Sequence, residues 1–234
     1  MLPGHIDPLY LIIVGGSMLA SHLVGAQMRR KFDEFSHMPL PYTGRDIAMR
    51  MLAQSGIRDV KVISTPGQLT DHYNPMDKTV NLSDAVYQMN SVAAAAVAAH
   101  ECGHAVQHAT LYPMLQLRSK LVPAVKIGSN FAPWLLMLGL AMAASGGGSA
   151  MLLVGIVLFA ATTLFAFVTL PVEFDASRRA LVWLEQSGIA TGLSREQAKS
   201  ALFWAAMTYT VAALASLGQL LYYIMMFMNA RNRE

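Results

Sequence analysis

The alanine-rich segment from Val92 to Thr110 contains the residues whose chemistry is clearest, because His100, Glu101 and His104 form the pattern H-E-x-x-H. Its alanines and its lack of proline predict a helix, on which two histidines four positions apart project from the same face. Such a pair is a typical ligand set for Zn²⁺, and the adjacent glutamate can take a proton from a zinc-bound water. The segment therefore predicts a site for one zinc ion with Glu101 as general base.

A catalytic zinc needs a third protein ligand and an open position for water. His108 lies one turn further along the same helix, but three consecutive turns of a straight helix cannot surround one ion. We therefore expect His108 beside the ligands or at the surface. Cys102 projects from roughly the opposite helix face and is expected to be a buried thiol. The third ligand should come from a distant carboxylate.

The composition is that of a membrane protein. Hydrophobic residues make up 54% of the 234 positions and charged residues 13%, and the mean hydropathy is +0.40. One cysteine excludes an intrachain disulfide. No interleaved basic and aromatic residues indicate a nucleic-acid partner. Apolar runs predict four transmembrane helices, with a glycine turn at 146–148 between the second and third: 8–27, 127–145, 149–172 and 201–228.

Basic residues predict the orientation of these spans. Eleven Lys and Arg lie between Arg29 and Lys126 and four between Arg178 and Lys199, whereas residues 1–28 and 127–177 contain none. Because basic loops stay in the cytoplasm, the polar segments are expected there. Four spans put the C-terminus outside, although two terminal arginines favour the opposite side, so the side of the C-terminus stays open.

The predicted fold is mainly α, a polytopic α-helical membrane protein with a small α+β zincin-like cytoplasmic domain. Its predicted parts are an N-terminal anchor (1–28), the metallopeptidase domain (29–126), a transmembrane hairpin (127–172), a cytoplasmic segment with the third zinc ligand (173–200), and the last span with its tail (201–234).

Within the polar domain, Thr43 to Ser55 resembles a capped amphipathic helix, and Asp59 to Ser64 alternates like a strand. Two further short extended segments precede the motif helix. The second, Lys78 to Asp84, is the candidate edge along which a peptide substrate adds as a strand. His72 and Tyr73 are candidates for oxyanion stabilisers or for turn residues, since Asn-Pro follows them.

Glu173 is the candidate third ligand, because it directly follows the third span on the side predicted for the histidines. Asp175 competes for this role. The alternative is that both carboxylates only solvate the start of a helix, where negative charge is favoured.

Three stretches together resemble the YugP-like family of neutral membrane zinc metallopeptidases: AAHECGHAVQHA, LTDHYNP and LPVEFDASRRAL. The resemblance extends from about Asp46 to Ala201. More distantly, the chain is similar to HtpX-type membrane peptidases, which pair H-E-x-x-H with E-x-x-x-D. The resemblance implies His100, His104 and Glu173 as zinc ligands and Glu101 as general base.

The chain departs from the distant relatives four positions after Glu173, where Ser177 replaces an aspartate that orients a ligating histidine. Serine can accept an imidazole N–H, but more weakly. Asp175 is an alternative acceptor, although two residues along a helix is the wrong face. Arg178 and Arg179 could steady an oxyanion or contact lipid phosphate.

The sequence therefore predicts a gluzincin-like zinc metalloendopeptidase of the cell membrane, multi-pass, with its active site facing the cytoplasm. Its expected partners are the lipid bilayer and protein or peptide substrates at the membrane surface. The alternative is a non-hydrolytic zinc-containing assembly or chaperone factor. A small transporter is disfavoured because His22 is the only ionisable residue within the spans. The natural substrate and the oligomeric state are not encoded recognisably.

Overall fold

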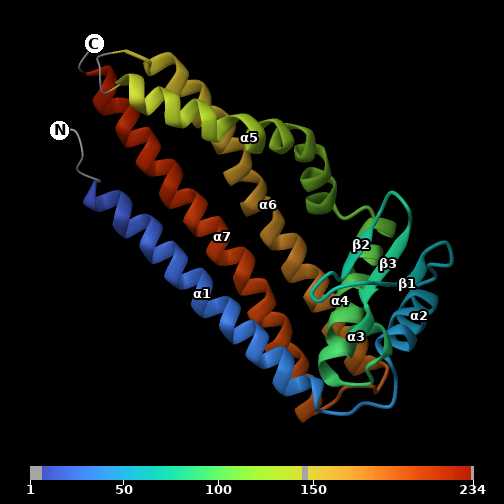
Figure 1. The fold of residues 1–234 in the computed structure, drawn as a ribbon. Coiled ribbons are helices and arrows are strands. Elements are labelled where there is room, and N and C mark those ends of the chain that lie inside the picture. Colours follow the sequence, from blue (N-terminus) through green and yellow to red (C-terminus); the bar gives the residue numbers. More distant parts are fainter. Residues whose placement is uncertain (1–6, 144–146, 233–234) are drawn as a thin grey trace. The chain divides into compact units, whose positions relative to one another are not determined.

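A computed structural model describes residues 7–143 and 147–232, and these residues are mainly helical. Within this part of the chain, four helices are long and apolar enough to cross a membrane (Figure 1): α1 (Pro8–Ser36), α5 (Pro113–Ala143), α6 (Ser149–Gln186) and α7 (Leu193–Arg231). The predicted number of spans is confirmed by this count. The glycine turn predicted at 146–148 lies partly outside the described residues.

The helices extend beyond the apolar runs that predicted them. Helix α6 continues past Val172 to Gln186, so Glu173 and Asp175 lie inside one helix of 38 residues. The alternative that these carboxylates solvate a helix start is therefore wrong. Both acidic side chains belong instead to a helix that begins in an apolar segment, and both are buried.

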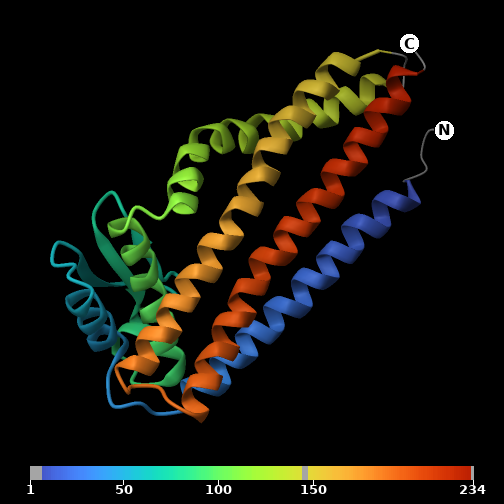
Figure 2. The same cartoon turned by 180° about the vertical axis from the view of Figure 1, so that it is seen from behind.

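One compact unit contains the apolar parts of the four long helices, namely the described residues 7–23, 117–143, 147–170 and 209–232. Glycine lets α5 and α6 approach closely, because a Cβ on Gly139 would lie 2.7 Å from the backbone of Leu152. Small residues serve such contacts between membrane helices. Helices α1 and α7 run side by side (Figure 2), with the rings of Tyr10 and Tyr222 5.2 Å apart.

The second compact unit, Val24–Gln116 with Pro171–Thr208, contains the H-E-x-x-H motif. A three-stranded sheet in the order β1-β3-β2 pairs its central strand in parallel with β1 and antiparallel with β2. The elements between the long helices are α2 (Gly44–Gln54), β1 (Lys61–Thr65), β2 (His72–Asn74), β3 (Thr79–Ser83), α3 (Asp84–Gln88) and α4 (Val92–Ala109).

The local predictions for this unit succeed in part. Helix α2 begins after Thr43, whose side chain forms a capping box with Asp46, and β1 lies close to its predicted position. The turn interpretation of His72 and Tyr73 is wrong, since both belong to β2. The candidate edge at residues 78–84 is also wrong, because β3 is paired on both sides and cannot accept an added strand.

A single apolar core holds this unit together. Ile47 of α2, Leu82 of β3 and the alanines of α4 are fully buried in it, and Leu184 of α6 joins them. Cys102 lies in the same core, where its thiol contacts the carbonyl oxygen of Ala48 at 3.6 Å. The alanine face of α4 thereby fixes the helix, and its opposite face is left for polar groups.

The sole cysteine allows the stability of this unit to be measured. Ile47→Ala should lower the free energy of unfolding by about 2–5 kcal/mol, the usual cost of emptying a core site. Labelling of Cys102 by a thiol reagent in detergent should accelerate by at least about 30-fold, because each 1.4 kcal/mol corresponds to about tenfold in the open population. Met49→Ala is the control, since Met49 is on the same helix but exposed. Equal labelling rates for the two variants would contradict this core assignment.

Candidate metal centre

Helix α4 positions the two motif histidines. The side chain of Ser91 caps the helix by accepting a hydrogen bond from the backbone N–H of Ala94. Residues 92–99 are nearly all buried against α2 and the sheet, which fixes the rotation of the helix about its axis. His100 and His104 then emerge on the face turned toward α6, as the spacing predicted.

Helices α4 and α6 approach closely at Gly103, one of the two variable positions inside the motif. A Cβ on Gly103 would lie 2.6 Å from the carbonyl oxygen of Ala176, closer than atoms of this kind approach. Ala176 is itself fully buried. The absence of a side chain at Gly103 therefore lets the two helices meet, and Glu173 of α6 reaches the histidines.

His100, His104 and Glu173 converge around one point. The Oε2 atom of Glu173 lies 3.3 Å from Nε2 of His100 and 3.6 Å from Nε2 of His104, and one donor atom from each residue lies within 4.8 Å of the others. Ligand bonds of about 2.0–2.2 Å arranged tetrahedrally separate two donors by about 3.3–3.6 Å. The two distances to Glu173 and the donor types therefore fit a zinc ion.

The second ring nitrogen of each histidine has its own partner. Nδ1 of His100 lies 3.1 Å from Oγ of Ser177, and Nδ1 of His104 lies 3.0 Å from Oε1 of Gln107. A carboxamide oxygen only accepts, so His104 donates from Nδ1, and its Nε2 is the ring nitrogen that faces Glu173. Ser177 can accept from His100 in the same way. Ligating histidines are usually held by such partners.

Gln107 connects His104 to Asp175. Its side chain is fully buried, and its Nε2 donates to the carbonyl oxygen of Val172 at 2.8 Å and to Asp175 at 3.0 Å. Asp175 also accepts from Arg178 and Arg179, each at 2.5 Å. Its carboxylate is thus turned away from the histidine pair, and Asp175 is not part of the three-residue group.

Sequence reasoning missed Gln107, although a signal was present. A polar residue three positions after a ligating histidine lies on the same helix face and can reach the imidazole. Among the described residues, Asp175 contacts Gln107, which in turn contacts His104, and it lies outside the donor group.

Negative charge surrounds His104. Burial alone would lower the pKa of His104, but its hydrogen bond with Glu173 and the charge of Glu101 raise the pKa above its ordinary value. The field that favours a proton here equally favours a metal cation. Glu101 is 8% exposed, and its carboxylate has no hydrogen-bond partner among the residues that the structure describes.

The other candidates from the sequence lie outside the donor group. Burial and the charge of Glu101 raise the pKa of Cys102 well above its ordinary value, so this thiol stays protonated in the core. His108 is exposed and its Nδ1 lies 2.8 Å from Oη of Tyr73. His72 is exposed on β2 and lies 2.8 Å from the carbonyl oxygen of Thr70.

Comparison with known proteins agrees with this geometry. The family described as "Putative neutral zinc metallopeptidase" matches residues 10–228. The chain belongs to this family. It is also 36% identical over 228 residues to "Putative membrane protease YugP" of Bacillus subtilis (strain 168), covering 97% of this chain and all of that protein. No solved structure matches the chain. The family description names zinc, the metal that two imidazoles and a carboxylate suit.

Gly103→Ala tests the contact that brings the donors together. Its Cβ must push α4 away from Ala176, and overpacking of this kind costs about 1–3 kcal/mol. If this free energy is lost from zinc binding, zinc affinity decreases by about 5- to 150-fold. Competition with a chromophoric chelator measures that affinity. Cys102→Ala alters the adjacent residue on the opposite face and should bind zinc like the wild type. Unchanged affinity in Gly103→Ala would show that the contact does not position the ligands.

Gln107→Met tests the hydrogen bond to His104 with a side chain of similar length that cannot accept from Nδ1. Loss of such a partner typically lowers metal affinity by about 10- to 100-fold. His108→Ala removes another side chain from the same helix and should leave zinc affinity within about twofold. Equal affinities for both variants and the wild type would remove Gln107 from the metal centre.

Proposed function

We propose that the chain is a zinc-dependent endopeptidase of the gluzincin type, with His100, His104 and Glu173 holding one zinc ion. The observation that supports this most directly is the convergence of three suitable donors from two helices beside an unpaired Glu101. Bound zinc would supply a Lewis acid that makes water nucleophilic at neutral pH and polarises a peptide carbonyl. The similarity of the chain to a protein named as a membrane protease is consistent with this reaction.

Glu101 supplies the acid–base chemistry in this proposal. Its carboxylate accepts the proton of the attacking water and then delivers it to the nitrogen of the leaving amine. The helix holds Glu101 beside His100 while the neighbouring side chains leave its oxygens unpaired. Ser177 and Gln107 hold the two imidazoles in the tautomer that presents Nε2 to the metal.

The number of donors supports catalysis over a structural role. A structural zinc site normally closes its fourth position with another cysteine or histidine. Among the described residues the group has three members, and neither Cys102 nor His108 belongs to it. A position for water therefore remains, which argues against the non-hydrolytic assembly factor.

We place the active site in a zincin-like domain at the cytoplasmic face of the cell membrane. A helix with H-E-x-x-H beneath a small mixed sheet supports the zincin assignment, and the clustering of basic residues around the site supports the side. Glu173 follows an apolar run directly, so the chemistry would take place at the membrane surface. Substrates would be extended segments of membrane-associated proteins or peptides.

Strand β2 replaces residues 78–84 as the proposed strand for substrate pairing. It lies at one edge of the sheet, and its Tyr73 contacts His108, one turn beyond His104 on the motif face. A peptide added to this edge would lie next to the metal centre. Tyr73 and His108 would then face the substrate backbone.

Glu101→Gln separates metal binding from hydrolysis. The purified variant should retain one zinc per chain and cleave an unstructured protein such as casein about 10²- to 10⁴-fold more slowly than the wild type, because the general base is lost. Glu173→Gln should lose zinc and activity together. Cleavage at the wild-type rate by zinc-loaded Glu101→Gln would contradict the mechanism. Full zinc content in Glu173→Gln would instead contradict the ligand set.

A further inference from the structure

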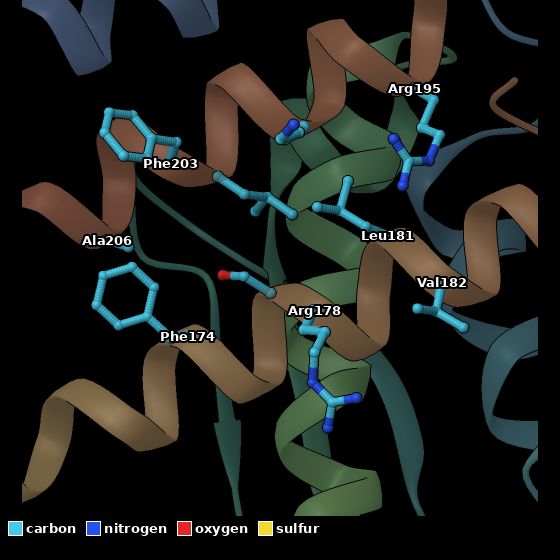
Figure 3. Close-up of a pocket in the computed structure, with 10 residues that line it drawn as sticks. Phe174, Arg178, Leu181, Val182, Arg195, Phe203 and Ala206 are labelled. Carbon is cyan, nitrogen blue, oxygen red and sulfur yellow. The ribbon is translucent and has the colours of Figure 1, made fainter. Parts of the chain in front are cut away.

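A pocket lies between the C-terminal part of α6 and the N-terminal part of α7 (Figure 3). Its volume is about 250 Å³. Phe174, Phe203 and Ala206 gather at one end and Arg195 lies at the other. Leu181, Val182 and Leu202 contribute further apolar lining, and Arg178 and Lys199 also border the pocket. The pocket therefore combines an apolar end with a cationic end.

The charges that line the pocket are all positive. Arg178 pairs with Asp175 at 2.5 Å, and Arg195 pairs with Glu185 at 2.7 Å and with Glu196 at 2.8 Å. Lys199 lies 3.6 Å from Glu196. None of these carboxylates is among the residues that line the pocket. The acidic partners orient the cations, whose remaining N–H groups can donate hydrogen bonds to an anion.

The two ends of the pocket also correspond to different depths in a membrane. Phe174 directly follows the third apolar run, and Phe203 and Ala206 lie in the run that begins at Ala201. Arg195 and Lys199 precede that run, where basic residues meet lipid head groups. The polarity of the pocket thus changes in the same order as that of a phospholipid, from head group to acyl chain.

Ser177 connects this pocket to the metal centre. Its side chain lines the pocket, and its Oγ lies 3.1 Å from Nδ1 of His100. Nδ1 is the ring nitrogen on the far side from Glu173, so the pocket lies behind His100 and does not open on the donor group. A molecule bound in the pocket would therefore contact Ser177, which holds the proposed ligand His100. It would not lie where the scissile bond of a peptide substrate is expected.

We propose that this pocket binds one anionic phospholipid from the surrounding bilayer. Arg195 and Lys199 would contact the phosphate, and Phe174, Phe203 and Ala206 would contact the first part of an acyl chain. The combination of two cations with an aromatic apolar end favours this ligand over a zwitterionic lipid or an inorganic anion. The assignment goes beyond the proposed peptidase activity and does not rest on it.

The test measures lipid binding to the full chain by native mass spectrometry in detergent, with dioleoyl phosphatidylglycerol and dioleoyl phosphatidylcholine titrated separately. The wild type should bind one phosphatidylglycerol at least about tenfold more tightly than phosphatidylcholine. Removing two cations in Arg195→Gln/Lys199→Gln should weaken phosphatidylglycerol binding by about 10- to 30-fold, since each basic residue near the surface contributes about fivefold. Lys120→Gln/Lys126→Gln removes the same charge next to another apolar run and should bind like the wild type.

A second variant separates the acyl chain from the head group. Phe203→Ala removes an aromatic ring from the apolar end of the pocket. It should weaken binding of the dioleoyl lipid more than binding of its dihexanoyl analogue, which has little chain to bury. The protection of Cys102 from thiol reagents checks that each variant retains its core.

Several results would overturn the assignment. Equal affinities for the two lipids would show that the pocket does not select an anionic head group. Equal losses of phosphatidylglycerol affinity in the two double variants would show that only the net charge of the protein matters. Displacement of the lipid by glycerol phosphate alone would identify a site for a soluble anion. Displacement by a peptide substrate would identify a peptide subsite. The same titration in Glu101→Gln requires no activity, so failure of the peptidase proposal would leave a positive binding result intact.

Discussion

The close contact between α4 and α6 at Gly103 is the constraint on which the metal centre depends. H-E-x-x-H supplies two donors on any regular helix, but the third donor is 69 positions further along the chain and reaches them only if the backbones nearly touch. Alanines on one face of α4 allow the same closeness to α2 and the sheet. Small side chains therefore determine the positions of the polar ones.

Burial of a polar network along this contact requires that each member finds a partner. Gln107 uses its oxygen for His104 and its amide hydrogens for Val172 and Asp175, so it is fully satisfied inside the protein. Asp175 is in turn neutralised by Arg178 and Arg179. An apolar residue at Gln107 would leave the buried Nδ1 of His104 without this hydrogen bond, and an unsatisfied buried donor is more costly than the bond alone.

Sequence reasoning identified what is local and missed what depends on pairing across the chain. The histidine pair, the cap at Thr43 and the apolar spans follow from periodicity within a few turns. Glu173 was expected beside the histidines because an apolar run ends directly before it, and it lies there. The centrality of β3 could not be predicted, since a parallel partner 18 residues earlier leaves no local pattern. Gln107 was missed because its importance arises from burial, and burial depends on where α6 packs.

Neutral partners on both imidazoles set the charge balance of the proposed zinc centre. A carboxylate beside Nδ1 makes an imidazole more basic and a stronger donor. Here the two imidazoles meet Ser177 and Gln107, and the carboxylate of Asp175 contacts Gln107 and two arginines. The ligand charge is then that of Glu173 alone, with Glu101 adjacent but unbound. A divalent cation held by these residues would keep more of its positive charge, which would favour ionisation of water at neutral pH.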